Sequence, residues 1–312
     1  MRPLTVGSAF AGIGGIDLGL EAAGVGQTKW YSEVNPAALR VMADQFPDAQ
    51  NLGSIVDLVG GMFPPDPVEL LAGGPPCQDI SKANSFGRHG LEGAKSSLFY
   101  VYAQLIDLVQ PRWVVMEQVT GLLTSGTNPG NDWRVVRDTY KELGYEIAVV
   151  VVNSLTYVPQ TRERLIIVGH REPGAAARAL LPLREDGGRD PGSVRPPKRS
   201  PARQSENGTL IYRKSRRPAH DQDGETWIDA DYANTLTLND VGLSRATVII
   251  VDFAGQPRIL TPEEWEACHG FPTGWTLAAG SDMDRWNRLG NTVSPPMIQR
   301  LGDGIRAVEC AA

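Results

Sequence analysis

The sequence predicts an α/β protein that has a doubly wound, Rossmann-like sheet and a second, smaller, irregular domain. Three observations carry this prediction. The chain opens with an apolar segment, a glycine-rich turn and an amphipathic segment, which is the order strand, loop and helix. Short apolar runs then alternate with helical patterns as far as residue 170. Residues 171–225 are rich in Arg, Pro, Gly and Asp and have little periodicity, which indicates a separate irregular part.

The composition is that of a large globular chain. It has 312 residues, 41% of them hydrophobic, which is enough for one large domain or for a large and a small one. No run of about 18 apolar residues occurs, so we expect no membrane span, and the amino terminus lacks a secretory pattern. Cys77, Cys268 and Cys310 have neither metal-ligand spacing nor a disulfide framework. We therefore expect no metal site and a reducing cytoplasm.

The net charge of −6 is unevenly distributed along the chain. Between Arg184 and Arg217, ten Lys or Arg residues stand against four Asp or Glu residues, a local charge of +6. Such segregation lets an acidic protein present a basic surface to phosphates. A solvated basic loop without a partner is the alternative.

The first predicted strand, Leu4 to Phe10, leads into a glycine turn, Ala11 to Gly15, and then into a helix that Gly24 is placed to end. This order lets the backbone close on a nucleotide-like ligand. Asp17 stands where the dinucleotide fingerprint has its third glycine, so the fingerprint is not matched. The ligand therefore need not carry a pyrophosphate.

An acidic residue, Glu33, ends the second predicted strand, Thr28 to Ser32, 18 residues after Gly15. A carboxylate at this point can accept both ribose hydroxyls of an adenosine, although a surface glutamate is the alternative. A helix from Pro36 to Phe46 follows, and the third strand is expected to end at Gly53–Ile55. Together these units predict a nucleoside site.

A Gly-Gly-Pro-Pro turn, residues 73–76, brings Cys77 to the carboxyl end of a buried strand, Val68 to Ala72. Ligands of open α/β sheets bind in the crevice beyond such strand ends. The stiff turn and its polar flank favour a presented thiol over a buried cysteine. Residues 82–97 are predicted to form a mobile loop over this site. Its cations are available to phosphates: Lys82, Arg88 and Lys95.

Glu117 stands at the carboxyl end of the next buried strand, Trp113 to Met116, beside the strand that leads to Cys77. A buried glutamate is costly unless it is used, and burial favours its protonated form. Farther along, Arg162 and Arg164 are two residues apart at the entrance of a strand and are expected to point the same way. They could contact an anion or a carbonyl group, or form structural salt bridges.

The remaining elements follow from the same periodicities. Helices are predicted at residues 98–110, 131–143 and 297–308. Strands are predicted at residues 146–152, 164–169, 235–237 and 247–253. Thr261 and Pro262 are a capping residue and a first helical residue. Cys268 and His269, at the end of that helix, are expected to pack in the core rather than to bind a ligand.

Seven motifs in this order resemble those of the DNA (cytosine-5) methyltransferase family over essentially the whole chain. They are FAGIGG at Phe10–Gly15, GGPPCQ at Gly73–Gln78, SSLF at Ser96–Phe99, MEQV at Met116–Val119, QTRERLIIVG at Gln160–Gly169, LTPEEWEACHGFP at Leu260–Pro272 and GNTVSPP at Gly290–Pro296. Any one of them could arise by chance, but seven in family order are hard to explain otherwise.

The resemblance implies a large catalytic domain that binds S-adenosyl-L-methionine, residues 1–170 and 281–312, and a small target-recognition domain, residues 171–280. It implies methyl transfer to C5 of a flipped-out cytosine in double-stranded DNA, through a covalent bond between Cys77 and C6. We expect a monomer in the cytoplasm of a prokaryotic cell or a phage-infected host, and a cognate restriction endonuclease is left open.

The family's site residues are carried over position by position. Cys77 matches the nucleophile, Glu117 the acid that bonds N3, and Arg164 the contact to the cytosine carbonyl. The glycine loop would wrap the methionine part of the cofactor, with Glu33 on the ribose and Ile55 on the adenine. The predicted cofactor residues are Phe10, Gly12, Ile13, Gly14, Gly15, Glu33, Ile55, Gly74, Pro76, Leu98, Asn291 and Val293. The predicted DNA contacts are Gln78, Ser81, Arg88, Arg162, Arg213, Lys214, Arg216 and Arg217.

Several positions depart from the family pattern. Gln118 replaces an asparagine that supports the catalytic turn, and Ser54 replaces a carboxylate that would hold the adenine amino group, for which Asp57 is a possible substitute. Val34 replaces an aromatic residue often found beside the ribose-binding acid. The segment Glu263–Glu266 lacks an arginine common in that motif.

Three other functions fit parts of the sequence. The first is an RNA cytosine-5 methyltransferase. The second is a catalytically weak DNA-binding relative, for which Gln118 and Ser54 are the support. The third is a nicotinamide-dependent or other small-molecule enzyme with a reactive cysteine. The missing third glycine and the arginine-rich second domain count against it.

Overall fold

The computed structural model describes most of the chain. The described residues are 2–61, 65–76, 98–125, 129–189, 210–214, 226–228, 232–242, 246, 248–251 and 257–311. The predicted loop at residues 82–97 and the beginning of the predicted strand at Thr247 lie outside them.

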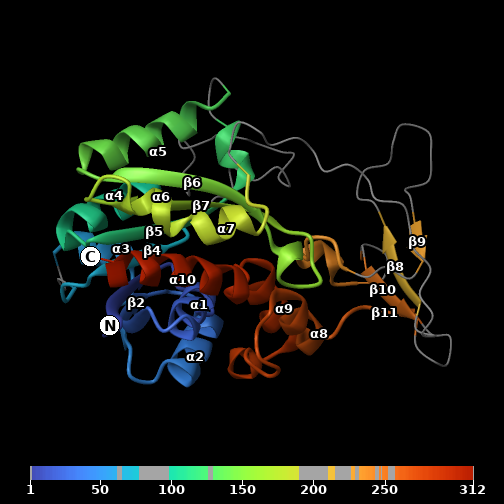
Figure 1. Ribbon diagram of the computed structural model, residues 1–312. Coiled ribbons are helices and arrows are strands. Elements are labelled where there is room, and N and C mark those ends of the chain that lie inside the picture. Colours follow the sequence, from blue (N-terminus) through green and yellow to red (C-terminus); the bar gives the residue numbers. More distant parts are fainter. Residues whose placement is uncertain are drawn as a thin grey trace.

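A seven-stranded sheet forms the centre of the protein (Figure 1). Its strands are β1 Leu4–Ala9, β2 Gly26–Ser32, β3 Gln50–Asn51, β4 Leu70–Gly73, β5 Trp113–Val119, β6 Glu146–Asn153 and β7 Glu163–His170. Their order is β3-β2-β1-β4-β5-β7-β6, and β7 runs antiparallel to both of its neighbours. The direction of strand addition reverses between β1 and β4, which is where open α/β sheets bind ligands.

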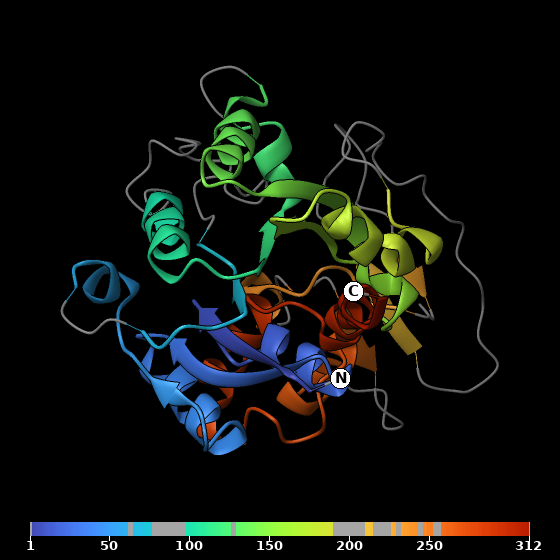
Figure 2. The same cartoon turned by 60° about the vertical axis from the view of Figure 1, so that its left-hand side comes forward.

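Helices cover both faces of this sheet (Figures 1 and 2). On one face lie α1 Gly15–Ala22, α6 Ala175–Ala179, α7 Leu181–Glu185 and α10 Pro295–Ala311. On the other lie α3 Ile55–Val59, α4 Leu98–Val109 and α5 Asn131–Glu142. Alternate side chains of each strand enter opposite clusters: Leu70 and Ala72 enter the first, and Leu71 the second. The predicted doubly wound α/β fold is therefore confirmed.

A third apolar cluster joins the glycine loop to the carboxyl-terminal motifs. It contains residues of α2 Pro36–Gln45, α8 Pro262–His269, η6 Leu277–Ala279 and α9 Asp282–Gly290. The indole Nε1 of Trp275 donates to the carbonyl of Ile13 at 2.8 Å. Thr261 and Glu264 form a reciprocal capping box at the start of α8, as Thr261 predicts.

Cys268 and His269 are packing residues, as predicted. His269 is fully buried, and its Nδ1 lies 2.7 Å from the carbonyl oxygen of Trp265. Burial lowers the pKa of His269 to about 3, and it raises the pKa of the Cys268 thiol to about 11. The imidazole and the thiol are therefore neutral near pH 7.

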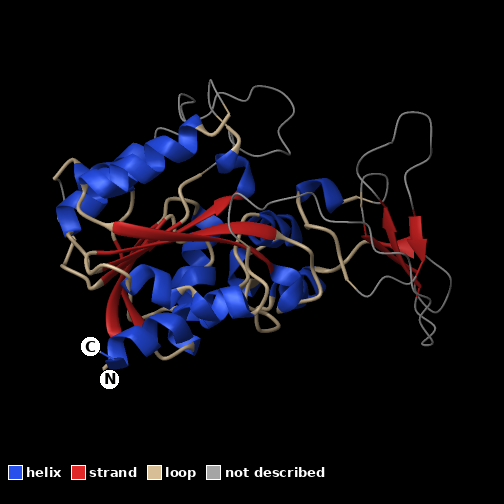
Figure 3. Cartoon of the chain, turned by 45° about the horizontal axis from the view of Figure 1, so that its top comes forward, coloured by secondary structure: helices blue, strands red, loops and turns tan. Residues whose placement is uncertain are grey.

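A second, four-stranded antiparallel sheet lies apart from the first (Figures 1 and 3). Its order is β11-β10-β8-β9, and the strands are β8 Leu210–Lys214, β9 Thr226–Ile228, β10 Val248–Val251 and β11 Pro257–Arg258. Gln160 connects the segment before β7 to other parts of the chain. Its amide donates to the carbonyl of Cys268 and accepts from the backbone of Leu236, both at 3.0 Å.

The structure differs from the sequence predictions at several elements. Residues 235–237 are not a strand, because Thr235 donates to the carbonyl of Thr161 and Thr237 caps the short helix η5 Leu238–Asp240. Helices α6 and α7 lie in the segment that the composition marks as irregular, and α9 was not predicted. Glu117 lies inside β5 rather than after it, since pairing with β7 continues to Val119.

Within the described ranges, no helix combines the length and the apolar character that crossing a membrane requires. In the same part of the chain, no three His, Cys, Asp or Glu side chains are grouped so that they could hold a metal ion.

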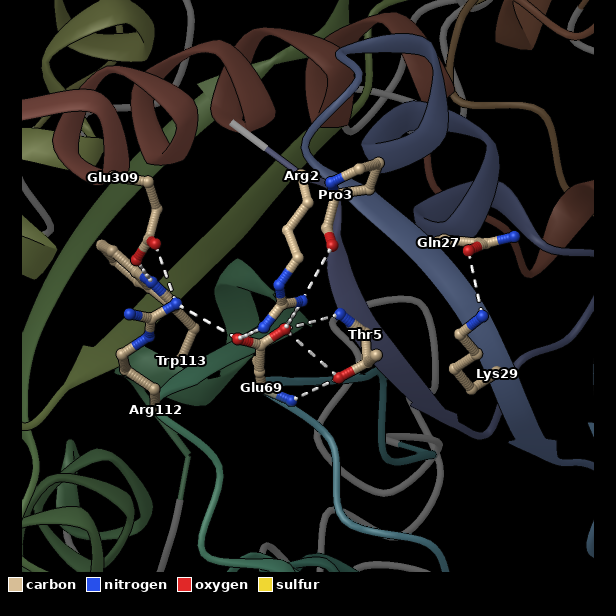
Figure 4. Close-up of polar contacts among 9 residues, drawn as sticks. All are labelled: Arg2, Pro3, Thr5, Gln27, Lys29, Glu69, Arg112, Trp113 and Glu309. Atoms are coloured by element: carbon tan, nitrogen blue, oxygen red, sulfur yellow. Dashed lines mark hydrogen bonds and ion pairs between the residues drawn. The ribbon is translucent and has the colours of Figure 1, made fainter.

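A polar network closes the amino-terminal edge of the sheet, opposite the predicted site (Figure 4). The carboxylate of Glu69 accepts two hydrogen bonds from Arg2, at 2.7 and 2.8 Å, and one from the backbone of Thr5 at 3.1 Å. Arg112 lies 3.6 Å from Glu69 and 2.8 Å from Glu309 of α10. The network thus links β1, β4 and β5 to the last helix.

We predict that Glu69→Gln lowers stability near neutral pH by up to about 1 kcal/mol, because the pair with Arg2 is largely exposed. The hydrogen bond from Arg2 holds the pKa of Glu69 below its ordinary value of 4.5. The stabilisation by the ionised Glu69 is therefore present above pH 4.5, and it is lost as the pH falls through the lower pKa that Glu69 has in the folded protein. Thermal unfolding against pH measures it.

The exposed pair of Arg137 and Asp138 on α5 is the control, and Asp138→Asn should change the melting temperature little. A melting temperature for Glu69→Gln equal to that of the unchanged protein at neutral pH would contradict a stabilising role for this network.

Candidate active site

The glycine loop after β1 adopts unusual backbone conformations. Phe10, Gly12 and Gly14 have positive φ values of 54, 58 and 76°. This region is costly for a bulky residue such as Phe10, by on the order of 1–2 kcal/mol, and such strain concentrates at functional sites. Among the described residues, a Cβ atom on Gly12 would meet only the carbonyl oxygen of Phe10, at 4.0 Å. Within that part of the chain, Gly12 is therefore not crowded by neighbouring side chains.

The carboxylate of Glu33 is held at the end of β2 by three backbone N–H groups. Its Oε2 accepts from Gly12 at 2.9 Å, and its Oε1 accepts from Val34 at 2.8 Å and from Asn35 at 2.7 Å. Because a carboxylate oxygen can accept two hydrogen bonds, Oε2 keeps the capacity to accept one from a ligand hydroxyl. This geometry fits the ribose role predicted for Glu33.

The carboxyl-terminal motif packs directly on the glycine loop. A Cβ atom on Gly15 would lie 2.7 Å from Oγ1 of Thr292 and 2.9 Å from the carbonyl oxygen of Val293. Val293 is buried, whereas Asn291 is exposed and its amide donates to the carbonyl of Asn287 at 2.9 Å. The first and the last of the seven motifs are therefore neighbours in space.

Four other predicted cofactor residues are buried or half-buried. Ile13 and Ile55 are buried, 1% and 4% exposed. Leu98 and Pro76 are half-buried, and Leu98 begins α4. A cofactor contact at these four positions stays a prediction.

Ser54 and Val34 are two of the positions that depart from the family pattern. The hydroxyl of Ser54 accepts from the backbone of Val56 at 3.2 Å, so Ser54 is the N-cap of α3. Asp57 lies in the first turn of the same helix. Val34, next to Glu33, is 66% exposed, which is high for an apolar side chain.

Glu117 and Arg164 meet on the neighbouring strands β5 and β7. The Oε1 of Glu117 lies 2.7 Å from the Nε of Arg164, and the two side chains are 18% and 12% exposed, respectively. A Cβ atom on Gly74 would lie 3.3 Å from the Oε2 of Glu117. The carboxylate is therefore paired with a guanidinium beside the turn that leads to Cys77.

Gln118 bonds the same turn from its other side. Its Nε2 donates to the carbonyl oxygen of Pro75 at 2.8 Å, and the side chain is buried. Strands β4 and β5 pair in parallel up to Gly73 and Met116, so the amide reaches the turn from the adjacent strand. The longer side chain in place of asparagine thus still contacts the turn that precedes Cys77.

Arg162 and Arg164 bind different groups. Arg162 is 3% exposed, and its Nη2 donates to the carbonyl oxygens of Gly290 and Thr292. Residue 162 precedes β7, so the alternation of a strand does not align it with Arg164. Arg162 is therefore buried against backbone carbonyls in the free protein, not exposed as its predicted role as a DNA contact requires, and this burial could not be read from the sequence spacing.

Several predicted residues lie outside the described ranges: Cys77, Gln78, Ser81, Arg88, Arg216 and Arg217. Arg213 and Lys214 lie on β8. The DNA contacts of this set, and the role of Cys77, stay predictions.

A buried carboxylate that belongs to none of the seven motifs lies behind the glycine loop. Asp17 is fully buried in α1, and its oxygens accept from the hydroxyls of Ser8 and Thr28, each at 3.0 Å. Burial raises the pKa of Asp17 to about 6, and the two hydroxyl bonds offset part of this effect. Its place at the third-glycine position of the fingerprint was the available signal.

We predict that the effect of Asp17→Asn on stability depends on pH. The pKa of Asp17 rises from 3.8 to about 6 on folding. The stabilisation that the protonated carboxyl gives the folded protein is therefore complete below pH 3.8, and it is lost as the pH rises through 6. The ionised form thus opposes folding by roughly 3 kcal/mol. The melting temperature of the variant relative to the unchanged protein should rise between about pH 4 and about pH 7 and stay constant above that range.

Ser8→Ala is the matched test, because it removes one hydrogen bond to the carboxylate. It should destabilise the protein more at high than at low pH. A stability difference for Asp17→Asn that does not vary with pH would show that Asp17 does not titrate in this way.

The chain is similar to characterised proteins along most of its length. The model of the C-5 cytosine-specific DNA methylase family matches residues 4–240. The Type II methyltransferase M.HpaII of Haemophilus parainfluenzae is 28% identical over 319 residues, which cover 95% of this chain and 87% of that protein. The Type II methyltransferase M.Bsp6I of Bacillus sp. (strain RFL6) is 27% identical, over 97% of this chain and 98% of that protein.

A phage relative and a solved structure agree with these matches. The orphan methyltransferase M.SPRI of Bacillus phage SPR is 34% identical over 176 residues, 55% of this chain and 39% of that protein. A crystal structure of an E. coli prophage protein, assigned as a DNA modification methyltransferase, has a TM-score of 0.61. It is 18% identical and covers 98% of this chain, so it supports the fold. The chain belongs to the C-5 cytosine-specific DNA methylase family, which confirms the resemblance that its seven motifs indicate.

Proposed function

We propose that this chain transfers a methyl group from S-adenosyl-L-methionine to C5 of a cytosine in double-stranded DNA, through a covalent adduct between Cys77 and C6. The observation that carries the proposal is the ion pair of Glu117 and Arg164. This pair lies beside Gly74, which precedes Cys77 by three residues in the sequence. This pair lies on the sheet whose strand order reverses beside the glycine loop.

The cofactor assignment is supported by the loop and by Glu33. No described side chain crowds Gly12, and Glu33 retains an acceptor for a ribose hydroxyl. The turn that carries Asn291 and Val293 adjoins Gly15, which would close the site from the other side. When bound, the cofactor supplies an electrophilic methyl group on a sulfonium sulfur.

The chemistry needs a nucleophile because C5 of cytosine does not attack a methyl sulfonium unaided. Addition of the Cys77 thiolate to C6 breaks the aromaticity of the ring and makes C5 enamine-like, which splits one hard step into two easier ones. After methyl transfer a base (water, hydroxide or a side chain) takes the C5 proton, the electron pair of that C–H bond restores the C5–C6 double bond, and the Cys77 thiolate is expelled. The base must leave the stack first, at a cost of a few kcal/mol.

The side chains of Glu117 and Arg164 suit one edge of the cytosine ring. N3 and the O2 carbonyl are adjacent on that edge, and the carboxyl and guanidinium groups are adjacent on β5 and β7. In the proposed complex the ion pair opens: Glu117 takes up a proton from solvent and donates it to N3, while Arg164 donates to O2. Both interactions stabilise the charge that develops as Cys77 adds.

We also propose the division of labour predicted from the sequence. Residues 1–170 and 281–312 would bind the cofactor and perform catalysis, and residues 171–280 would recognise the target. The local charge of +6 between Arg184 and Arg217 suits contact with phosphates. Helices α6 and α7, at the start of the second part, pack on the face of the large sheet that α10 covers.

The bacterial and phage relatives support a proposal for the kind of cell in which this activity takes place. M.HpaII is named a Type II methyltransferase and M.SPRI an orphan methyltransferase. We propose that the chain modifies DNA as a monomer in the cytoplasm of a prokaryotic cell or a phage-infected host, with or without a cognate endonuclease.

Duplex DNA with 5-fluorocytosine should trap the protein. Fluorine cannot leave as a cation, so elimination is blocked and Cys77 stays bonded to C6. Because the target sequence is unknown, the substrate is long DNA with fluorocytosine throughout. We expect a one-to-one complex that survives denaturant and requires S-adenosyl-L-methionine, as resolved by denaturing electrophoresis and mass spectrometry.

The complex should be absent in Cys77→Ser and should form much more slowly in Glu117→Gln, whose amide cannot supply the proton. Full methylation of ordinary DNA without a trapped species on the fluorinated substrate would disprove the covalent route. Trapping on fluorinated RNA but not on DNA would favour the RNA alternative.

We predict that Gln118→Leu slows methyl transfer about tenfold at saturating cofactor and leaves cofactor binding unchanged. The substitution leaves the buried carbonyl of Pro75 without its donor, which costs about 1–3 kcal/mol and frees the turn before Cys77. Single-turnover rates measure the effect. Gln118→Glu keeps the shape of the side chain but cannot donate, so it should be impaired to the same extent; a full rate in both variants would contradict the role of this bond.

A further inference from the structure

Arg162 joins two distant segments inside the protein. Its Nη2 donates to the carbonyl oxygen of Gly290 at 3.1 Å and to that of Thr292 at 2.7 Å. Its own backbone N–H donates to Oδ1 of Asn153 at 3.1 Å, which holds the chain at the entrance of β7. The side chain therefore spans from the arginine motif to the turn between α9 and α10.

The two carbonyl groups lie on either side of Asn291. A guanidinium that binds both of them holds the backbone before and after that residue. The next residue, Val293, is buried, and its carbonyl oxygen and Thr292 Oγ1 are the atoms that a Cβ on Gly15 would meet. Arg162 thus holds the segment that packs against the glycine loop.

Burial of this arginine needs compensation. A guanidinium removed from water loses several kcal/mol of hydration unless polar groups replace the water. Gly290 is the last residue of α9, so its carbonyl lies at a helix carboxyl terminus, where partial negative charge attracts a cation. The contact is therefore favourable at this turn, and a neutral side chain of equal size would not supply it.

We propose that Arg162 is a positioning residue for the cofactor, because it holds the Gly290–Val293 turn against Gly15 and so sets one wall of the cofactor site. This inference rests on the proposed function, in which that site binds S-adenosyl-L-methionine. Arg164, two residues along, pairs with Glu117. The segment Arg162–Arg164 then contacts both the turn that borders the cofactor site and the proposed catalytic acid.

The test compares Arg162→Met and Arg162→Lys by titration calorimetry with S-adenosyl-L-methionine. We expect the dissociation constant to rise at least tenfold in the methionine variant and by less in the lysine variant, whose ammonium can still donate to a carbonyl. The rate of methyl transfer at saturating cofactor should fall less than threefold, so that the defect appears in KM for the cofactor.

Arg300→Met is the matched control. Arg300 bonds Asp186 at 2.7 Å and joins α10 to the residue that follows α7, and its ion pairs are with residues outside the Gly290–Val293 turn. This variant should lose thermal stability without a change in the dissociation constant. An equal rise in that constant in both methionine variants would assign the effect to general destabilisation and overturn the inference.

Gly15→Ala tests the same contact from the opposite side, and it carries the test if Arg162→Met does not fold. The added Cβ would lie 2.7 Å from Thr292 Oγ1 and displace the turn. It should raise the dissociation constant, and combining it with Arg162→Lys should raise the constant by less than the product of the single effects.

The outcomes separate the inference from the proposed function. An unchanged protein that binds no S-adenosyl-L-methionine would refute the proposed function, and the inference with it. An unchanged protein that binds it, with dissociation constants for both Arg162 variants within twofold of its own, would refute the inference alone.

Discussion

The packing of α10 on α1 is the contact on which the rest of the site depends. It brings the carboxyl-terminal helix back to the first strand–loop–helix unit, so that residues far apart in the sequence share one core. The approach is close: a Cβ on Gly19 would lie 2.5 Å from Cβ of Ile298, and one on Gly302 would lie 2.5 Å from Cβ of Ala23. A larger side chain at either glycine would push the helices apart and withdraw the turn before α10 from the glycine loop.

Buried charged groups are balanced in different ways, and these differences match their proposed roles. The carboxylate of Glu266 accepts from the backbones of Gly274 and Thr276 and pairs with Arg285, which makes it a structural group. Asp17 is bonded by two neutral hydroxyls, so its charge is poorly compensated and its pKa is raised. Glu117 is paired with Arg164 in the free protein, and in the proposed mechanism each of the two groups exchanges this contact for one with the substrate.

The two edges of the sheet have separate tasks. At the amino-terminal edge, the Glu69 network uses charged side chains to tie strands to α10. At the carboxyl-terminal edge, Glu33 and Glu117 are held by backbone and side-chain partners beside a strained loop. Stabilising contacts at the first edge can therefore compensate for conformational strain at the second, because both edges belong to one cooperative sheet.

Local physical chemistry in the sequence determined the strands of the large sheet except β3, which ends at Asn51 and not at Gly53–Ile55, and it determined the cap at Thr261, the glycine loop with Glu33, and the family. These features depend on side-chain periodicity, on backbone preferences and on residues a few positions apart, all of which can be read along the chain. The order of the strands is not local. Because β7 lies antiparallel between β5 and β6, Arg164 reaches Glu117, and the segment before it places Arg162 against the turn at Gly290. The tertiary structure alone decided these pairings. The spacing of two residues between Arg162 and Arg164 predicts that both side chains point the same way, whereas packing gives them different partners.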